Sequence, residues 1–235
     1  MIGLAIGFLI ILACGGALAY ACIIPSSQLF APVVNRGPAR SGSVVLTFDD
    51  GPAPPFTERV LDILAQHNIS ATFFLCGKNV ESHPEIARRI VREGHTIGNH
   101  TYSHPFLMGR SRRFIAEEID DAQEAIERVT GVRPTLFRPP YGVRWFGLMP
   151  VLRQRGLKLV MWSVMGFDWK YKTQAIVSAT TRRLHPGAVI LLHDGHEQPP
   201  SGGIDQSSTV EALPAIIEAA ARSGLTFASI EKFVA

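Results

Sequence analysis

Two adjacent carboxylates, Asp49 and Asp50, follow an apolar run that is typical of a buried strand. Because neighbouring side chains at a strand end point in different directions, one carboxylate could bind a metal ion while the other stays free as a base. The next two residues, Gly51 and Pro52, also suit a strand-to-helix turn. Taken alone, the pair therefore indicates either a site or a turn.

A pair of histidines, His100 and His104, follows a second short strand-like run. Residues four apart lie on one face of a helical turn, and this spacing suits two ligands of one Zn²⁺-type ion. Such a pair can also be a polar surface feature. Its position after a strand, in a chain that also has a double Asp, favours a metal site.

Three further polar groups follow predicted strands. Arg138 precedes two prolines, and its guanidinium could hold a carboxylate in a bidentate way or lie on a rigid surface loop. Trp169, beside Asp168, could offer a flat face to a sugar ring, although buried tryptophan is commoner. His193 ends an apolar strand and is placed to act as an acid or a base.

These residues must be positioned by alternating strands and helices. Strands are expected at 44–48, 71–75, 96–97, 135–137, 157–162, 188–192 and 225–229, and helices at 57–67, 84–93, 112–129, 147–155, 172–184 and 210–222. About seven β/α units with short connections indicate an α/β protein with a parallel sheet, and their number favours a distorted (β/α) barrel. Catalytic residues in such a barrel lie at the C-terminal ends of the strands.

An apolar N-terminal helix is expected before this barrel. Ile2 to Ile24 contains no charged residue and is long enough to span ~30 Å of hydrocarbon. Ala19-Tyr20-Ala21 has the form that a signal peptidase accepts, so residues 1–24 are predicted as a membrane anchor or a signal segment. Residues 25–43, with several Pro, Gly and Ser, are predicted as a linker, and residues 44–235 as the catalytic domain.

Composition excludes several classes of protein. The formal net charge is only +3, and Lys and Arg are spread through the chain, so no nucleic-acid partner is indicated. The three cysteines, Cys14, Cys22 and Cys76, cannot build a disulfide framework or a paired-cysteine metal site. The 235 residues, 46% of them hydrophobic, are enough for one sizeable core.

The polar motifs, in this order, resemble the signature motifs of the polysaccharide deacetylases, carbohydrate esterase family four, whose domain is also called the NodB homology domain. TFDDGP and HTYSH are specific matches, and RPPYG and LLHDG strengthen them. The resemblance covers Val44 to Phe227. The fourth motif of the family is usually D-S-x-D-W, and here it reads Met165-Gly166-Phe167-Asp168-Trp169, so the first Asp and the Ser are absent.

The resemblance implies a role for each matching residue of the metal centre. Asp50, His100 and His104 would bind the metal, and Asp49 would be the catalytic base. Arg138 would orient Asp49. An Asp-His-His set leaves positions open for water and substrate, as a catalytic Zn²⁺ site requires. Zn²⁺ is therefore the expected cofactor, and Co²⁺ or Ni²⁺ would also fit such ligands.

The resemblance also implies the residues on the substrate side. His193 would be the general acid, and Asp168 would tune it. The backbone N–H of Tyr141 would help to hold the oxyanion, and Leu191 would line the acetyl pocket. Trp169 is expected to contact the sugar.

The expected function is metal-dependent hydrolysis of N-acetyl groups from an amino-sugar polymer or oligomer, of the chitooligosaccharide or peptidoglycan type, with release of acetate. The alternatives are an O-acetyl polysaccharide esterase and a non-catalytic carbohydrate-binding module. The partners expected are an N-acetylated polysaccharide or oligosaccharide, and a membrane through residues 2–24.

Such a substrate places the catalytic domain outside the cytoplasm, on a single N-terminal span of the cell membrane. The nearest cationic residues, Arg36 and Arg40, follow the span and favour the opposite orientation, but long domains can translocate regardless of charge. The alternative is secretion after signal cleavage near Ala21.

Overall fold

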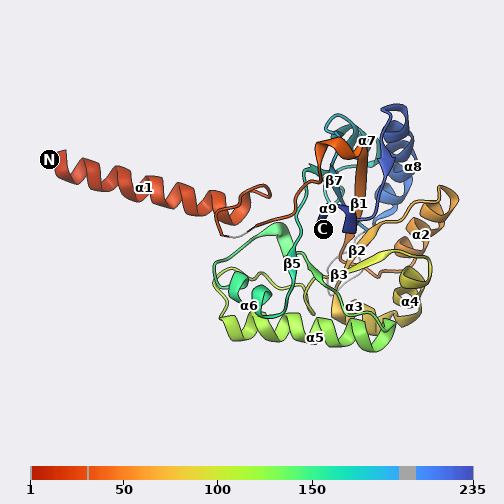
Figure 1. Cartoon of the computed structure of the whole chain (residues 1–235), viewed down its shortest axis with the longest axis horizontal. Helices are drawn as coiled ribbons and strands as arrows, with labels where there is room; N and C mark the ends of the chain where they lie inside the picture. The colour runs from red at the N-terminus through yellow and green to blue at the C-terminus, as the bar shows by residue number, and fades with distance from the viewer. Residues whose placement is uncertain (1, 31, 196–204, 235) are drawn as a thin grey trace.

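The strands form one curved parallel sheet in the computed structural model, which describes residues 2–30, 32–195 and 205–234. The order of neighbouring strands is β5-β4-β3-β2-β1-β7-β6, and β8 pairs with β1 (Figure 1). The strands of the described residues are β1 Ser43–Asp49, β2 Thr72–Leu75, β3 Thr96–Asn99, β4 Leu136–Phe137, β5 Lys158–Leu159, β6 Val164–Met165, β7 Val189–His193 and β8 Thr226–Phe227.

Helices connect the strands and cover the sheet. The described helices are α1 Ile2–Ile23, α2 Phe56–Gln66, α3 Gly77–Ser82, α4 Pro84–Arg92, α5 Arg112–Thr130, α6 Leu148–Gln154, α7 Thr173–Thr181, α8 Ser207–Arg222 and α9 Glu231–Val234. Two 3₁₀ turns lie at Ala39–Ser41 and Pro140–Gly142. The predicted α/β fold is confirmed, and the curved sheet forms a half-barrel that is open between β5 and β6.

Strand β1 lies at the centre of the sheet and is buried on both faces, as a central parallel strand must be. Its alternating residues Val44, Leu46 and Phe48 pack in the core between the sheet and helices α2, α4, α7 and α8. Val45 packs in the second core, inside the curve of the sheet. Because side chains alternate along a strand, Asp49 also faces the inside of the half-barrel.

Helix α5 shows why the predicted helices form where they do. Ser111 accepts a hydrogen bond from the Phe114 N–H, which caps the first turn, and Gly131 ends the helix with a φ of 75°. The apolar residues that recur along one face, such as Ile115 and Ile119, are buried. The helix runs along one edge of the body (Figure 1) and supports the loop after β3.

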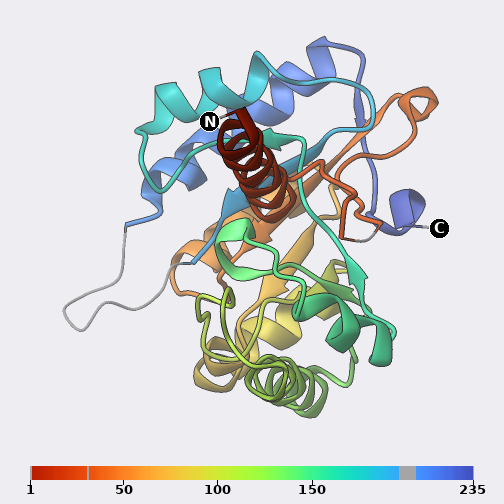
Figure 2. The same cartoon turned by 90° about the vertical axis from the view of Figure 1, so that its left-hand side faces the viewer.

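Helix α1 projects from the body, and its axis points toward the viewer in Figure 2. Among the described residues, no helix has the length and apolar character needed to cross a membrane. The predicted N-terminal span and the cell-membrane localisation are therefore wrong, and the membrane partner predicted through residues 2–24 is not supported.

The stretch predicted as a linker, residues 25–43, packs against the barrel. Val34 forms a parallel bridge with Val160, and Arg36 an antiparallel bridge with Ala188. The buried Arg144 donates from its guanidinium to the carbonyl groups of Ser27, at 2.8 Å, and Ile24. The packed unit thus begins before Val44, because backbone hydrogen bonds and a buried guanidinium tie this stretch to the body.

Candidate active site

Three buried side chains bring their ligand atoms together at the C-terminal edge of the sheet. Oδ1 of Asp50 lies 3.2 Å from Nε2 of His100 and 3.1 Å from Nε2 of His104, and the three atoms all lie within 4.8 Å of one another. Zn²⁺ bonds of ~2.0–2.2 Å in a tetrahedral arrangement place ligand atoms ~3.3–3.6 Å apart. The predicted triad therefore fits a small divalent cation.

The hydrogen bond at Nδ1 of His100 leaves Nε2 to face the site. Nδ1 of His100 lies 2.7 Å from the carbonyl oxygen of Arg138, which can only accept, so Nδ1 carries a proton. Nε2 faces Oδ1 of Asp50, an oxygen with no hydrogen-bond partner among the described residues. In a neutral ring, Nε2 presents a lone pair to this oxygen, and a cation between the two atoms would satisfy both.

The pKa of Asp50 agrees with its use as a ligand. Burial alone would raise the pKa of this carboxyl group, but its contacts with His100 and His104, together with the charges of His104 and His193, hold the pKa well below the usual value. The group is therefore an ionised carboxylate at neutral pH.

The HTYSH segment positions its histidines in a way that the helical spacing argument did not predict. It is an irregular loop after β3, and Thr101 and His104 have φ values of 69° and 58°. The Asn99 side chain accepts from the Thr101 N–H at 2.8 Å, and the Thr101 hydroxyl accepts from the His104 N–H at 3.1 Å. The helical interpretation of the pair is wrong, because left-handed residues, not a helical turn, bring the two rings together.

Glu118 of α5 holds the outer part of this loop. Its carboxylate accepts from the Tyr102 N–H at 3.1 Å, the Ser103 N–H at 2.9 Å and the Ser103 hydroxyl at 2.7 Å. Glu118 was not predicted from the sequence, because it is one of several acidic residues along the same helix. No pattern in the sequence distinguishes it from Glu117.

Asp49 is held beside the metal triad by Arg138. A guanidinium nitrogen of Arg138 donates to Oδ1 of Asp49 at 2.6 Å and to the Thr47 hydroxyl at 2.9 Å. The other carboxylate oxygen, Oδ2, lies 3.8 Å from Nε2 of His100 and faces the metal site. Arg138 contacts Asp49 through one nitrogen and not through the two that a bidentate contact would use.

The buried guanidinium of Arg138 is itself fixed from several sides. It donates to the carbonyl groups of Met161, at 3.1 Å, and Val160, at 3.3 Å, and lies 4.1 Å above the Phe74 ring. Burial lowers the pKa of Arg138, and the neighbouring Asp49 carboxylate opposes this effect. A guanidinium stays protonated at any physiological pH, so this contact is an ion pair.

A second acid–base pair faces the triad. Nδ1 of His193 lies 2.8 Å from Oδ1 of Asp168, and the other oxygen of Asp168 accepts from the His193 N–H at 2.7 Å and the Thr209 hydroxyl at 2.9 Å. Burial would lower the pKa of His193, but the charge and hydrogen bond of Asp168, with the charges of Asp50 and Asp49, raise it to about 10. The imidazole is therefore protonated at neutral pH.

A cavity of about 440 Å³ joins these groups. Its lining contains the predicted residues Asp49, Asp50, His100, His104, Tyr141, Trp169, Leu191 and His193, together with Gly142, Trp162 and Met165. Arg138 and Asp168 lie behind this wall, where they contact Asp49 and His193. Trp162, Met165 and Gly142 were not predicted as lining residues, because nothing in a sequence shows which residues near a strand end face a cavity.

Aromatic rings form the rim of this cavity. The Trp169 ring is 43% exposed and meets the His193 ring edge-on at 5.3 Å. The Tyr141 ring is 53% exposed and lies edge-on to His104 at 4.8 Å. The backbone of Tyr141 has a φ of 58°, which turns the loop sharply at the edge of the site. Exposed rings beside a polar cavity are suited to the apolar faces of sugars.

The fold and the site together comprise a half-barrel with a buried Asp-His-His cluster that could hold a metal ion, beside the Asp49–Arg138 ion pair and the Asp168–His193 pair. The family model described as polysaccharide deacetylase matches residues 36–160. The chain therefore belongs to the polysaccharide deacetylase family, and the predicted family is confirmed.

Curated relatives cover most of the chain. A peptidoglycan-N-acetylglucosamine deacetylase of Bacillus cereus is 40% identical, over 83% of this chain and 69% of the relative. A chitooligosaccharide deacetylase of Sinorhizobium fredii is 38% identical, over 84% of this chain and 94% of the relative.

Solved structures show the same fold. A peptidoglycan N-acetylglucosamine deacetylase bound to a hydroxamate-type benzamide superposes with a TM-score of 0.79 at 37% identity, over 86% of this chain and 92% of the other. A family four carbohydrate esterase from Streptomyces lividans, bound to acetate, has a TM-score of 0.72 at 36% identity, over 80% of this chain and 93% of the other. A carbohydrate esterase family four pseudoenzyme from Bacillus anthracis has a TM-score of 0.78 at 28% identity, over 87% of this chain and 69% of the other.

Proposed function

We propose that this protein hydrolyses N-acetyl groups on an amino-sugar polymer or oligomer and releases acetate. The observation that carries this proposal is the convergence, in one cavity, of the Asp50-His100-His104 triad, the Arg138-held Asp49 and the Asp168-held His193. Relatives named as peptidoglycan and chitooligosaccharide deacetylases support this substrate class.

The metal we propose is Zn²⁺, held by Asp50, His100 and His104, and Co²⁺ or Ni²⁺ would suit the same ligands. When bound, such an ion lowers the pKa of a bound water towards ~7 and polarises the acetyl carbonyl group. The hydrogen bond from His100 to the Arg138 carbonyl supports this assignment, because it fixes Nδ1 as the donor and aims Nε2 at the site.

Asp49 is the proposed base. Arg138 occupies its Oδ1, so the proton of the attacking water is received at Oδ2, the oxygen that faces the metal site. The fixed guanidinium prevents the carboxylate from turning away, and it keeps Asp49 out of the set of metal ligands.

His193 is the proposed acid. An amine is a poor leaving group, and it departs only when its nitrogen receives a proton. Asp168 accepts the Nδ1–H of His193, which leaves the Nε2–H for the substrate nitrogen. General acid–base help of this kind is typically worth ~10²–10⁴-fold for each group.

Three further residues complete the proposed substrate site. The backbone N–H of Tyr141 would stabilise the oxyanion of the tetrahedral intermediate, and Leu191, which is buried in the cavity wall, would contact the acetyl methyl group. Trp169 would stack on the sugar ring at the rim.

Two other functions use the same fold. An O-acetyl esterase would need the same residues, and a non-catalytic binding module would need none of them. The similarity to a pseudoenzyme means that the fold alone does not establish catalysis. The complete set of acid, base and ligand side chains in this chain favours an enzyme.

The test is acetate release by the full chain from an N-acetylglucosamine oligomer and, in parallel, from O-acetylated xylan. We expect release from the N-acetylated substrate that needs added Zn²⁺, stops with a chelator and is lost in His100→Ala. Release only from xylan would favour the esterase. If folded, metal-loaded protein released acetate from neither substrate, the proposal would be wrong.

A further inference from the structure

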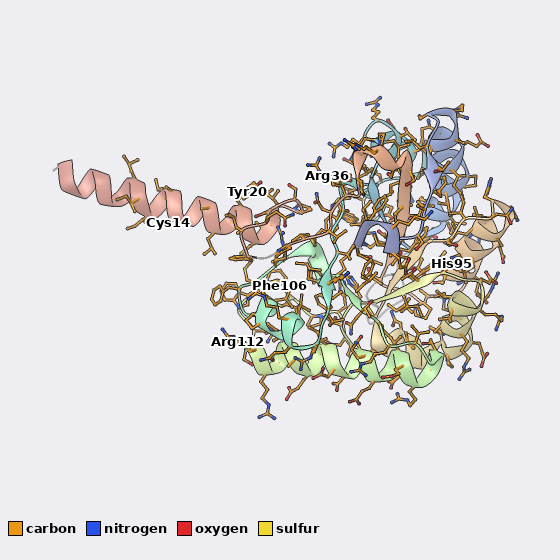
Figure 3. The ribbon with its side chains drawn as sticks, in the orientation of Figure 1. Cys14, Tyr20, Arg36, His95, Phe106 and Arg112 are labelled. Carbon is orange, nitrogen blue, oxygen red and sulfur yellow. The ribbon has the colours of Figure 1, made fainter. Side chains whose placement is uncertain are left out.

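A second cavity, of about 490 Å³, adjoins the catalytic cavity. One of its walls is the segment after α1, with Asn35 and Arg36, and another contains Phe167 and Arg183. Figure 3 labels Arg36 on the side of the body where α1 joins it. A volume of this size lies within the ~300–1,000 Å³ that is usual for binding sites of small ligands. We call this space the arginine cavity.

Among the residues that the structure describes, the lining of the arginine cavity carries positive charge and no carboxylate. Arg36 and Arg183 both belong to this described lining, which contains no Asp or Glu. In the part of the chain that the structure describes, neither guanidinium forms an ion pair or a side-chain hydrogen bond. Other exposed arginines, such as Arg128 and Arg133, do pair with glutamates. Two uncommitted guanidinium groups at one cavity form a receptor for a carboxylate.

The wall between the two cavities is shared. Trp162 and Met165 line both the catalytic cavity and the arginine cavity. Phe167 lines the arginine cavity, and Trp169 lines the catalytic cavity, with their ring centres 5.6 Å apart. Phe167 has a φ of 54°, so the chain turns sharply between them. A chain of sugar units that left the catalytic cavity over this wall would enter the arginine cavity.

We propose that the arginine cavity is a subsite for a carboxylate on a sugar unit next to the one that is deacetylated. This inference rests on the proposed function and narrows its substrate to an acidic glycan. The lactyl group of a muramic acid unit and the carboxyl group of a uronic acid unit share this chemistry. An oligomer of N-acetylglucosamine has no carboxylate, so it occupies the catalytic cavity without engaging Arg36 or Arg183.

The subsite has a kinetic signature. Its contacts lie away from the reacting amide, so they bind the substrate and the transition state equally and act on KM and not on kcat. Arg36→Gln and Arg183→Gln should each raise KM for an acidic glycan about 5- to 30-fold and leave the neutral oligomer unchanged. Arg182→Gln is the matched control, because Arg182 is exposed beside Arg183 but does not line the cavity.

The experiment uses the full chain, loaded with Zn²⁺, and four oligomers of equal length. They are a neutral N-acetylglucosamine oligomer, an alternating oligomer with muramic acid, the same oligomer with its carboxyl groups converted to amides, and an alternating oligomer with glucuronic acid. KM and kcat are measured at low and high salt, since salt screens charge pairs. Preference for the muramic or for the uronic oligomer identifies the source of the carboxylate.

We expect a lower KM for an acidic oligomer than for its amide. This difference in KM should disappear at high salt and in Arg36→Gln and Arg183→Gln, and it should remain in Arg182→Gln. Equal KM values for acid and amide, or equal effects of the three variants, would overturn the subsite. Acetate release from the neutral oligomer would then leave the proposed function standing. Release from none of the four oligomers would contradict both proposals.

Discussion

Replacement of Glu118 by Gln tests how the metal loop is held. The Glu118 carboxylate receives three hydrogen bonds, from the Tyr102 N–H, the Ser103 N–H and the Ser103 hydroxyl. Gln keeps one carbonyl oxygen and presents an NH₂ group to the remaining donors. The same loop holds Thr101 and His104 at positive φ, a conformation that costs ~1–3 kcal/mol per residue and persists only where the surroundings fix it.

The size of the effect follows from these contacts. Hydrogen bonds to a charged group are worth ~1.5–3 kcal/mol each, less where the group is half-exposed, as Glu118 is. If Gln retains one contact and loses the others, the loop loses ~2 kcal/mol, which corresponds to a ~30-fold rise in the Kd for Zn²⁺. Substitutions in the hydrogen-bonded shell of metal ligands typically cost ~10–100-fold in affinity.

The assay is competition for Zn²⁺ between the protein and a chromophoric chelator. Glu117→Gln is the matched control, because Glu117 lies one residue earlier on α5 and, among the described residues, pairs with the exposed Arg113 and not with the metal loop. A thermal melt of the metal-free proteins shows whether both variants fold. If folded Glu118→Gln bound Zn²⁺ within about twofold of the wild type, the argument that Glu118 positions the loop would be refuted.

Three further outcomes are expected. Asp49→Asn should abolish acetate release yet bind Zn²⁺ normally by the same competition assay, and loss of the metal would refute the split of roles between Asp49 and its neighbour. Asp168→Asn removes the charge that raises the pKa of His193, so the acid should lose its proton at lower pH. The alkaline limit of kcat/KM should therefore move to lower pH, while activity falls ~10²–10⁴-fold. An alkaline limit at the wild-type pH would contradict the proposed pairing of Asp168 with His193. Gly142→Ala should lower the Tm and the activity together, because the added Cβ would lie 2.2 Å from the Trp162 ring and residue 142 has a φ of 65°. A Tm within about 1 °C of the wild type would show that the loop adapts to the added Cβ.

The order of strands and helices was predictable because each has a local signal. Strand β1 and helix α5 begin and end within two residues of their predicted bounds, since an apolar run, a serine cap and a C-terminal glycine are all visible in the sequence. Helix α3 and strand β6 were missed, because six and two residues are too few to show a period. Their formation depends on packing that a local pattern does not contain.

The residues of the site were predictable, and their geometry was not. Matching motifs selected the groups that now lie in one cavity, but His100 and His104 converge through a loop with positive φ values and not through a helix. The stretch 25–43 was predicted as a linker from its composition, yet it contributes Asn35 and Arg36 to a cavity. Composition indicates how freely a segment can bend, whereas its partners are set by the rest of the fold.

The departure from the family pattern at Met165 and Gly166 can now be placed in the molecule. Met165 lies in the wall that the catalytic and arginine cavities share, and a Cβ at Gly166 would meet the Leu192 side chain at 2.6 Å. Neither residue is one of the groups assigned to proton transfer or metal binding. An aspartate in place of Met165 would put a negative charge beside the two arginines, and it would oppose a carboxylate there. We therefore expect the departure to act on the choice of substrate and to leave the chemistry of acetyl removal in place.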